Sequence, residues 1–375
     1  MAGKNEYTVF DYLQWRGDLT LQQDPFNEVD NLVLCIIAYI NLRKIDRLWS
    51  KNPKDAMLIG DVCARLTAAD EQLGLSSLDY IPVMRAAAET ERFRDTRLFA
   101  FESRNDETKQ MQFAAVSFLL PDGSVFIAYR GTDTSLVGWK ENFNMSYLET
   151  VPAQARATEY AQEVIRACKH RPYRIGGHSK GGNLAVFAAA RSTPDIQQRI
   201  LEVYNNDGPG FTDYLMGDPG YLAMVPRIKT YVPQSSVIGM LLEHEEPYTI
   251  IKSNQVSVLQ HDPYSWEVMG PNFVPMQSIT ADSQFVNQTI KAWVASMDTQ
   301  ERNRLVDALF GLLGTGGIDK ALDIFHPRNI RTYIKTLGND PETRQILSAE
   351  FQNLMEAAKR TRMQPGDAKT LPEGK

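Results

Sequence analysis

One short segment, residues 177–181 (GHSKG), restricts the fold of this chain more than any other feature. It lies between an apolar strand pattern at 173–177 and a run of small and apolar residues at 184–190, typical of a buried helix. In this setting G-x-S-x-G predicts a sharp strand-to-helix turn that presents Ser179. Glycines two residues before and after the serine would let strand and helix approach closely. The alternative is a glycine-rich turn that only packs a helix on a sheet or binds phosphate.

Strand and helix patterns alternate around this turn. A helix pattern covers 153–169, and another begins near Gly181. Strands are expected at 97–102, 111–120, 124–129, 173–177, 201–206, 228–232 and 248–252. Pro121-Asp122-Gly123 predicts a hairpin turn between the second and third of these. The alternation predicts an α/β fold, with a mostly parallel sheet and helices on both faces.

Both ends of the chain have helical patterns. The first helix is expected at 26–45, with Asn27 as its cap. Further helices are expected at 54–70, 82–92, 283–297, 301–313, 317–325, 327–337 and 341–360. The expected organisation is an N-terminal helical section at 1–95, an α/β core at 96–276, a C-terminal helical section at 277–360 and a disordered polar tail at 361–375.

Composition excludes several classes of function. The 375 residues include 40 Lys and Arg against 46 Asp and Glu, a net charge of −6 without a basic stripe, so nucleic acid is not an expected partner. The start has no signal-peptide pattern, and the longest apolar run, 32–40, is far shorter than the ~20 residues that span a bilayer. A cytoplasmic location without an integral membrane segment is therefore expected. Composition predicts no oligomeric state.

The cysteines indicate neither disulfides nor a metal site. The chain has an odd number of cysteines, Cys35, Cys63 and Cys168. They lie among apolar residues and form no CxxC pair. They are expected to be buried thiols. No metal or other cofactor is expected, because a Ser–His site needs none.

A serine nucleophile requires a base, and two of the five histidines follow Ser179 in the order Ser…Asp/Glu…His. His261 is favoured because it follows an apolar segment and opens a loop. His244 lies among glutamates, which predicts a solvated turn, and remains the alternative. Of the others, His170 is expected at the surface and His326 between helices. His178 is expected on the serine turn, facing away from the substrate side.

The acid that orients the base is expected to be Asp207. It follows the 201–206 strand and enters a glycine-rich turn, residues 207–210 (DGPG). The alternative is an ordinary turn-forming aspartate. Asp213 and Asp218 are weaker candidates, and Asp262 is too close to His261 in sequence to orient it easily.

The oxyanion of an acyl-transfer reaction needs two N–H donors. The backbone of Lys180 is expected to supply one, and Thr132, at the end of an earlier strand, can supply its N–H and its hydroxyl. The apolar residues 237–242 follow the 228–232 strand and should reach the carboxyl edge of the sheet. There Met240 and Leu241 are expected to contact a substrate acyl chain. The alternative is a short helix packed in the core.

Three segments together resemble a known group of proteins: 129–143 (YRGTDTSLVGWKENF), 176–189 (GGHSKGGNLAVFAA) and 205–211 (NNDGPGF). They are similar to the class-three (fungal-type) lipases and, more closely, to a bacterial lipase-like family of unknown function within the α/β-hydrolases. Segments 11–18, 25–40 and 260–266 also fit that bacterial family, so the resemblance covers about residues 8–270.

The resemblance implies roles for individual residues. Ser179 takes the nucleophile position, Thr132 the oxyanion position and His261 the base position. Trp139 stands where these lipases have a tryptophan shortly before an acidic residue, here followed by Glu141 and Asn142, and is expected in the substrate pocket.

Two departures from the lipase pattern matter. The lipases usually carry their acid after the next strand, but residues 233–238 (PQSSVI) contain no carboxylate. The acid is therefore Asp207 or absent. In addition, Lys180 replaces the usual apolar residue after the nucleophile, which predicts a more polar floor to the site.

These features predict a serine hydrolase that cleaves a carboxylic ester, an esterase or lipase-like enzyme with a small-molecule ester or lipid substrate. The intact serine turn, the downstream histidine and the oxyanion loop favour it. The missing acid favours a non-catalytic binding or scaffold protein with the same fold. An acyltransferase using the same triad is the third hypothesis.

Overall fold

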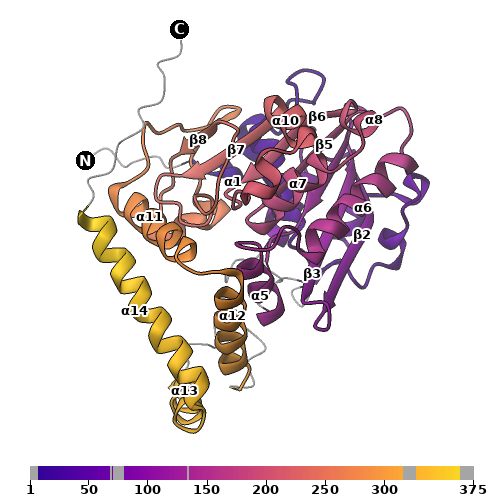
Figure 1. Cartoon of the computed structure of the whole chain (residues 1–375). Helices are drawn as coiled ribbons and strands as arrows, with labels where there is room; N and C mark the ends of the chain where they lie inside the picture. Colours follow the sequence, from indigo (N-terminus) through magenta and orange to yellow (C-terminus); the bar gives the residue numbers. More distant parts are fainter. Residues whose placement is uncertain (1–6, 68–69, 71–79, 133–134, 316–326, 364–375) are drawn as a thin grey trace.

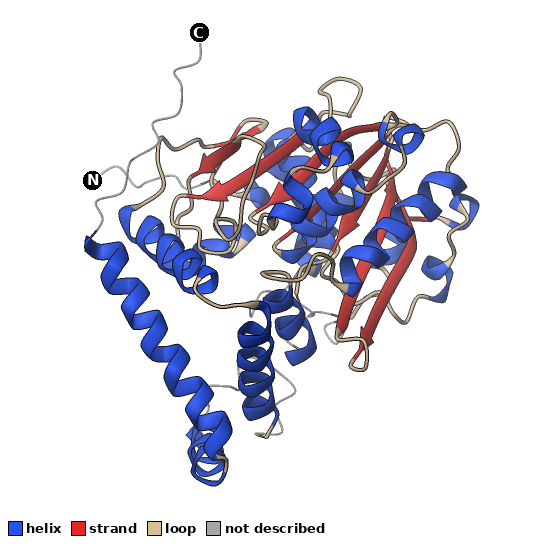
Figure 2. Cartoon of the chain, in the orientation of Figure 1, coloured by secondary structure: helices blue, strands red, loops and turns tan. Residues whose placement is uncertain are grey.

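The computed structural model describes residues 7–67, 70, 80–132, 135–315 and 327–363. Its main sheet has eight strands, which neighbour one another in the order in which they occur along the chain. Their bounds are β1 Met57–Leu58, β2 Arg97–Asp106, β3 Met111–Leu119, β4 Val125–Tyr129, β5 Tyr173–His178, β6 Ile200–Asn206, β7 Ile228–Pro233 and β8 Tyr248–Ile251. Strands β1 to β4 pair antiparallel, and β4 to β8 pair parallel. The expected α/β fold with a mostly parallel sheet is confirmed (Figure 2).

The predicted hairpin joins β3 to β4. Leu119 pairs with Val125, and the turn closes through a hydrogen bond from the Leu120 N–H to the Ser124 carbonyl. Gly123 has a φ of +85°, a conformation that side chains other than glycine rarely adopt.

Strand β4 is buried on both faces, as expected for a central strand of an α/β sheet. Phe126 and Ala128 pack into one core, and Val125, Ile127 and Tyr129 pack into the other. The alternation follows from the pleat, which directs successive side chains to opposite faces.

Helices cover each face. On the first lie α2 (Glu28–Ile37) and α4 (Ile81–Ala88), and on the second lie α6 (Pro152–Ala167) and α7 (Lys180–Ala190). In Figure 1, α6 and α7 lie in front of the sheet and the indigo N-terminal helices behind it. Shorter elements complete these layers: α8 Pro194–Gln197, α9 Asp213–Met216, α10 Pro219–Met224 and a separate hairpin of β9 Val268–Met269 and β10 Asn272–Phe273.

The N-terminal section is less helical than its sequence predicts. Asn27 caps α2 as expected, since its side chain accepts from the N–H groups of Val29 and Asp30, but the helix ends at Ile37 instead of continuing to residue 45. The helix expected at 54–70 is wrong. Met57 pairs with Leu98 in β1, and only α3 (Ile59–Cys63) is an α-helix in the described part of that range. Pairing with the sheet edge satisfies backbone groups that a helix would have used.

The C-terminal section contains four described helices: α11 Ala281–Ala295, α12 Thr299–Gly314, α13 Pro327–Asn339 and α14 Pro341–Met363. Helix α14 packs against α11 and α12 and runs along the outside of the molecule (Figure 1). It includes residues 361–363, which the sequence assigns to a disordered tail; residues 364–375 and the helix expected at 317–325 lie outside the described residues.

Two further expectations concern the chain as a whole. No helix in the described ranges is long and apolar enough to cross a membrane. All three cysteines are free thiols: Cys35 and Cys168 are buried, and Cys63 is half-buried.

A buried ion pair fastens the N-terminal section internally. The Arg92 guanidinium donates to Asp30 through Nε at 2.6 Å and Nη2 at 2.5 Å, and neither side chain is exposed to solvent. The Tyr12 hydroxyl also donates to Asp30, at 2.6 Å. Three elements, α1 (Val9–Arg16), α2 and the segment after α4, therefore meet at one carboxylate.

Arg92→Met is expected to lower the free energy of unfolding by about 3–5 kcal/mol, because it leaves the Asp30 carboxylate buried without its cation. Chemical denaturation measures this change. Arg94→Met is the control, since Arg94 is exposed and, within the described part of the chain, forms an ion pair only with exposed Glu91. Equal, small losses for the two variants would contradict the role assigned to Arg92.

Candidate active site

Ser179 lies at a sharp turn between β5 and α7, as its sequence predicts. Its backbone has a φ of +59° and a ψ of −134°, a conformation that costs a non-glycine residue of the order of 1–3 kcal/mol. The flanking glycines make the turn possible: a Cβ on Gly177 would lie 2.2 Å from the Gly181 backbone, and a Cβ on Gly181 would lie 2.2 Å from the Tyr129 carbonyl oxygen. Larger residues at either position would push α7 away from the sheet.

The structure brings Asp207 and His261 together. Asp207 directly follows β6 and is fully buried, and its Oδ2 accepts a hydrogen bond from His261 Nδ1 at 2.6 Å. The imidazole is 21% exposed and belongs to a 3-10 turn at Ser257–His261. Because a carboxylate can only accept, Nδ1 carries the proton in this contact, which leaves Nε2 as the basic nitrogen.

The segment after β7, which has no carboxylate where the lipases usually carry their acid, forms hydrogen bonds with Asp207. The Ser236 hydroxyl donates to Asp207 Oδ1, and the Gly239 N–H donates to the same oxygen at 3.2 Å. Residues 236–239 therefore supply two hydrogen-bond donors to a carboxylate that follows the preceding strand.

The side chain of His244 is largely buried, whereas its sequence predicts a solvated turn. Its side chain is only 6% exposed; Nδ1 lies 3.1 Å from Glu246 Oε1, and Nε2 lies 2.9 Å from the Gly239 carbonyl oxygen. Burial raises the pKa of Glu246, but hydrogen bonds from His244, Tyr221 and Thr230 outweigh it and hold that pKa below its usual range. The charged stretch 243–246 thus hides a buried pair that sequence pattern alone does not distinguish from a surface turn.

Sequence reasoning also missed what His178 contacts. Its ring is buried, with Nδ1 3.0 Å from the Tyr39 hydroxyl and Nε2 2.8 Å from the His261 backbone oxygen. Burial, reinforced by the neighbouring His261, holds the pKa of His178 well below its usual value. The residue beside the serine therefore contacts the backbone of the histidine opposite.

The two residues expected to stabilise an oxyanion lie beside the serine turn. A Cβ on Gly131 would lie 3.0 Å from the Ser179 Cβ, so residues 131–132 pass directly over the turn. The Asn142 amide donates to the Thr132 hydroxyl at 2.7 Å and fixes its position. Lys180 is the first residue of α7.

The sequence predicts that Lys180 makes the floor of the site more polar. The structure instead directs its side chain into the protein. It is 1% exposed, and its Nζ donates to Gln112 Oε1 at 2.6 Å and to Glu141 Oε2 at 3.0 Å. Glu141 is fully buried and also accepts from the N–H groups of Gln112 and Ala153. The ammonium is thus enclosed by acceptors.

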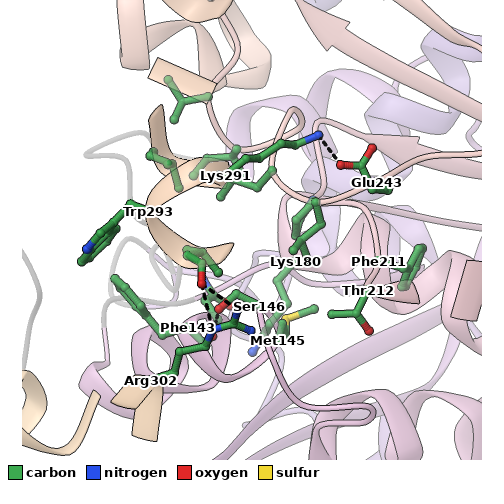
Figure 3. Close-up of a pocket in the computed structure, with 18 of the residues that line it drawn as sticks. Phe143, Met145, Ser146, Lys180, Phe211, Thr212, Glu243, Lys291, Trp293 and Arg302 are labelled. Carbon is green, nitrogen blue, oxygen red and sulfur yellow. Dashed lines mark hydrogen bonds and ion pairs between the residues drawn. The ribbon is translucent and has the colours of Figure 1, made fainter. Parts of the chain in front are cut away.

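A cavity of about 610 Å³ opens beside the serine (Figure 3). Both Ser179 and His261 line it, and most of its wall is apolar. The apolar wall residues are Trp139, Phe143, Met145, Pro209, Phe211, Val237, Ile238, Leu241, Leu242, Ile290, Trp293, Val294 and Ala295. The last four belong to α11, and Arg302 of α12 also lines the cavity, so the C-terminal helices form part of its wall.

The segment 237–242 is a series of turns rather than the alternative short helix. Leu241 and Trp139 both line the cavity. Met240 does not line the cavity but packs, partly buried, against the small core of Val232, Ile250 and Ile279. Leu241 therefore faces the cavity while its neighbour Met240 faces the small core.

The strand order and the parallel pairing of β4 to β8 define an α/β fold. The chain belongs to the Mbeg1-like family, whose model matches residues 87–311. This family is lipase-like, so the broader resemblance read from the sequence is confirmed. No curated protein and no solved structure matches the chain.

Asp207→Asn is expected to lower kcat for ester hydrolysis by about 10²–10⁴-fold, because an amide can stabilise neither the correct His261 tautomer nor the imidazolium. Steady-state kinetics with a p-nitrophenyl ester measures this. Asp213→Asn is the matched control: Asp213 also lines the cavity, but the carboxylate that accepts from His261 Nδ1 is that of Asp207. If the two variants have equal rates, Asp207 is not the orienting acid.

Proposed function

We propose that the protein is a serine hydrolase that cleaves carboxylic esters with an apolar acyl chain, through an acyl-enzyme on Ser179. The observation that carries this proposal is the 2.6 Å hydrogen bond between His261 and Asp207 beside a cavity that Ser179 also lines. The strained serine backbone supports it, since strain of this kind is concentrated at functional sites. Membership of a lipase-like family agrees with it.

In the proposed first step, His261 Nε2 accepts the proton of the Ser179 hydroxyl while Ser179 Oγ bonds to the ester carbonyl carbon. The carbonyl oxygen becomes an anion, which accepts hydrogen bonds from the backbone N–H of Lys180 and from Thr132. Asp207 keeps the proton on His261 Nδ1 and stabilises the imidazolium that forms.

In the second step, the bond between the carbonyl carbon and the alcohol oxygen breaks, and His261 donates its new proton to the leaving alcohol. Water then attacks the acyl-enzyme with the same base and the same oxyanion donors, which releases the acid and restores Ser179. The apolar wall of the cavity holds the acyl chain during both steps.

Ser179→Ala is expected to abolish fluorophosphonate labelling and to reduce p-nitrophenyl ester hydrolysis by several orders of magnitude, because the covalent step is lost. Ser146→Ala is the control, since Ser146 lines the same cavity but its hydroxyl donates to the Phe143 carbonyl. Wild-type protein that is neither labelled nor active would favour the binding or scaffold hypothesis. Labelling with faster transfer to an added alcohol than to water would favour an acyltransferase.

Leu241→Asp is expected to lower kcat/KM for an octanoyl ester at least tenfold relative to an acetyl ester, because each methylene buried in the cavity contributes about 0.8 kcal/mol. The ratio of the two kcat/KM values measures this preference. Leu222→Asp is the control, as Leu222 is exposed on α10 and does not line the cavity. An unchanged ratio in folded Leu241→Asp protein would show that the acyl chain does not contact this wall of the cavity.

A further inference from the structure

His178 adjoins the proposed nucleophile but takes no part in the proposed reaction. Its ring lies beside the proposed base, with ring centroids 4.6 Å apart, and its Nε2 contacts the His261 backbone oxygen at 2.8 Å. The carbonyl can only accept, so Nε2 carries the proton. The other nitrogen, Nδ1, is then an acceptor and receives the Tyr39 hydroxyl at 3.0 Å.

We propose that His178 is a positioning residue: it holds the backbone of His261 at the distance from the serine turn that proton transfer requires. This inference rests on the proposed function. His178 and Ser179 are consecutive residues, so the imidazole that contacts the base is fixed by the same short turn that fixes the nucleophile. Movement of the turn therefore carries the base with it.

His261 is held at two separate points. Asp207 fixes the far nitrogen of its ring, and His178 fixes its backbone carbonyl. The preceding carbonyl, of Gln260, accepts from the Trp266 indole N–H at 2.9 Å, and this indole lies edge-on to the His178 ring at 5.8 Å. Two successive carbonyls of the histidine loop thus receive ring N–H groups from buried side chains.

The Tyr39 contact requires a neutral His178, because Nδ1 can accept the hydroxyl proton only when it carries none itself. Burial lowers the pKa of His178 well below its usual value, and the nearby His261 lowers it further. A pKa shifted downward means that the ring stays neutral as the pH falls until well below the usual range. Neutrality also matters during the reaction, because His261 becomes a cation when it takes the serine proton, and a second cation beside it would oppose that step.

Tyr39 connects this contact to the N-terminal section. It lies just after α2, and its hydroxyl donates to His178 Nδ1, which favours the tautomer with the proton on Nε2. Residues near the start of the chain therefore reach the base through one intervening imidazole.

The test compares His178→Leu with His178→Gln, both measured against wild type with a p-nitrophenyl ester and by the rate of fluorophosphonate labelling at Ser179. His178→Leu removes the donor and is expected to lower kcat about 100-fold, as a small displacement of a catalytic group does, with KM changed less than twofold because the acyl wall is intact. His178→Gln, whose side-chain N–H can reach the same carbonyl, is expected to recover most of the lost kcat.

A folded His178→Leu protein with wild-type kcat overturns the inference and leaves the proposed function standing. Equal losses in folded Leu and Gln variants overturn the hydrogen bond as the cause. Wild-type protein without activity or labelling refutes the proposed function itself. If neither His178 variant folds, Tyr39→Phe decides: a threefold to tenfold fall in kcat at constant KM supports the inference, and an unchanged kcat overturns it.

Discussion

The close approach of α7 to the sheet is the constraint on which the site depends. Gly177 and Gly181 face each other where any Cβ would collide with backbone, and only this spacing lets Ser179 adopt its left-handed turn. Gly208, two residues after β6, has the same function, since a Cβ there would lie 2.4 Å from the Ser179 carbonyl oxygen. Every residue of α7 is buried, and this apolar packing offsets the strain at its first turn.

The segment after β7 combines two requirements in a few residues. Ser236 and Gly239 hold the carboxylate of Asp207, while Ile238 and Leu241 form the wall of the cavity. The buried His244–Glu246 pair holds the Gly239 carbonyl from the other side. The backbone that orients the proposed acid therefore also shapes the space for the acyl chain, and a change in one alters the other.

Local patterns predicted much of this architecture from the sequence. The strand, turn and helix around Ser179 are specified within about twenty residues, and the position of Asp207 follows from parallel strands ending at one edge. His178 and Tyr39 could not be paired in this way, because they are 139 residues apart and neither lies in a pattern that indicates a partner. The part of the cavity wall from α11 was missed for the same reason. The helix expected at 54–70 failed because pairing with β2 outweighed local propensity.

Lys180 illustrates how one departure from a family pattern is accommodated. An ammonium beside the serine would alter the site if it faced the cavity, but Glu141 and Gln112 draw it into the protein. Burying such a pair costs desolvation, so its main effect is on geometry rather than on net stability. Glu141 lies in α5 (Leu136–Asn144), the helix whose Asn142 fixes the Thr132 hydroxyl. One helix thus contacts both residues that are proposed to stabilise the oxyanion, through Lys180 on one side and through Thr132 on the other. The ion pair fixes α5 against α7 and thereby constrains the spacing of the two proposed oxyanion donors.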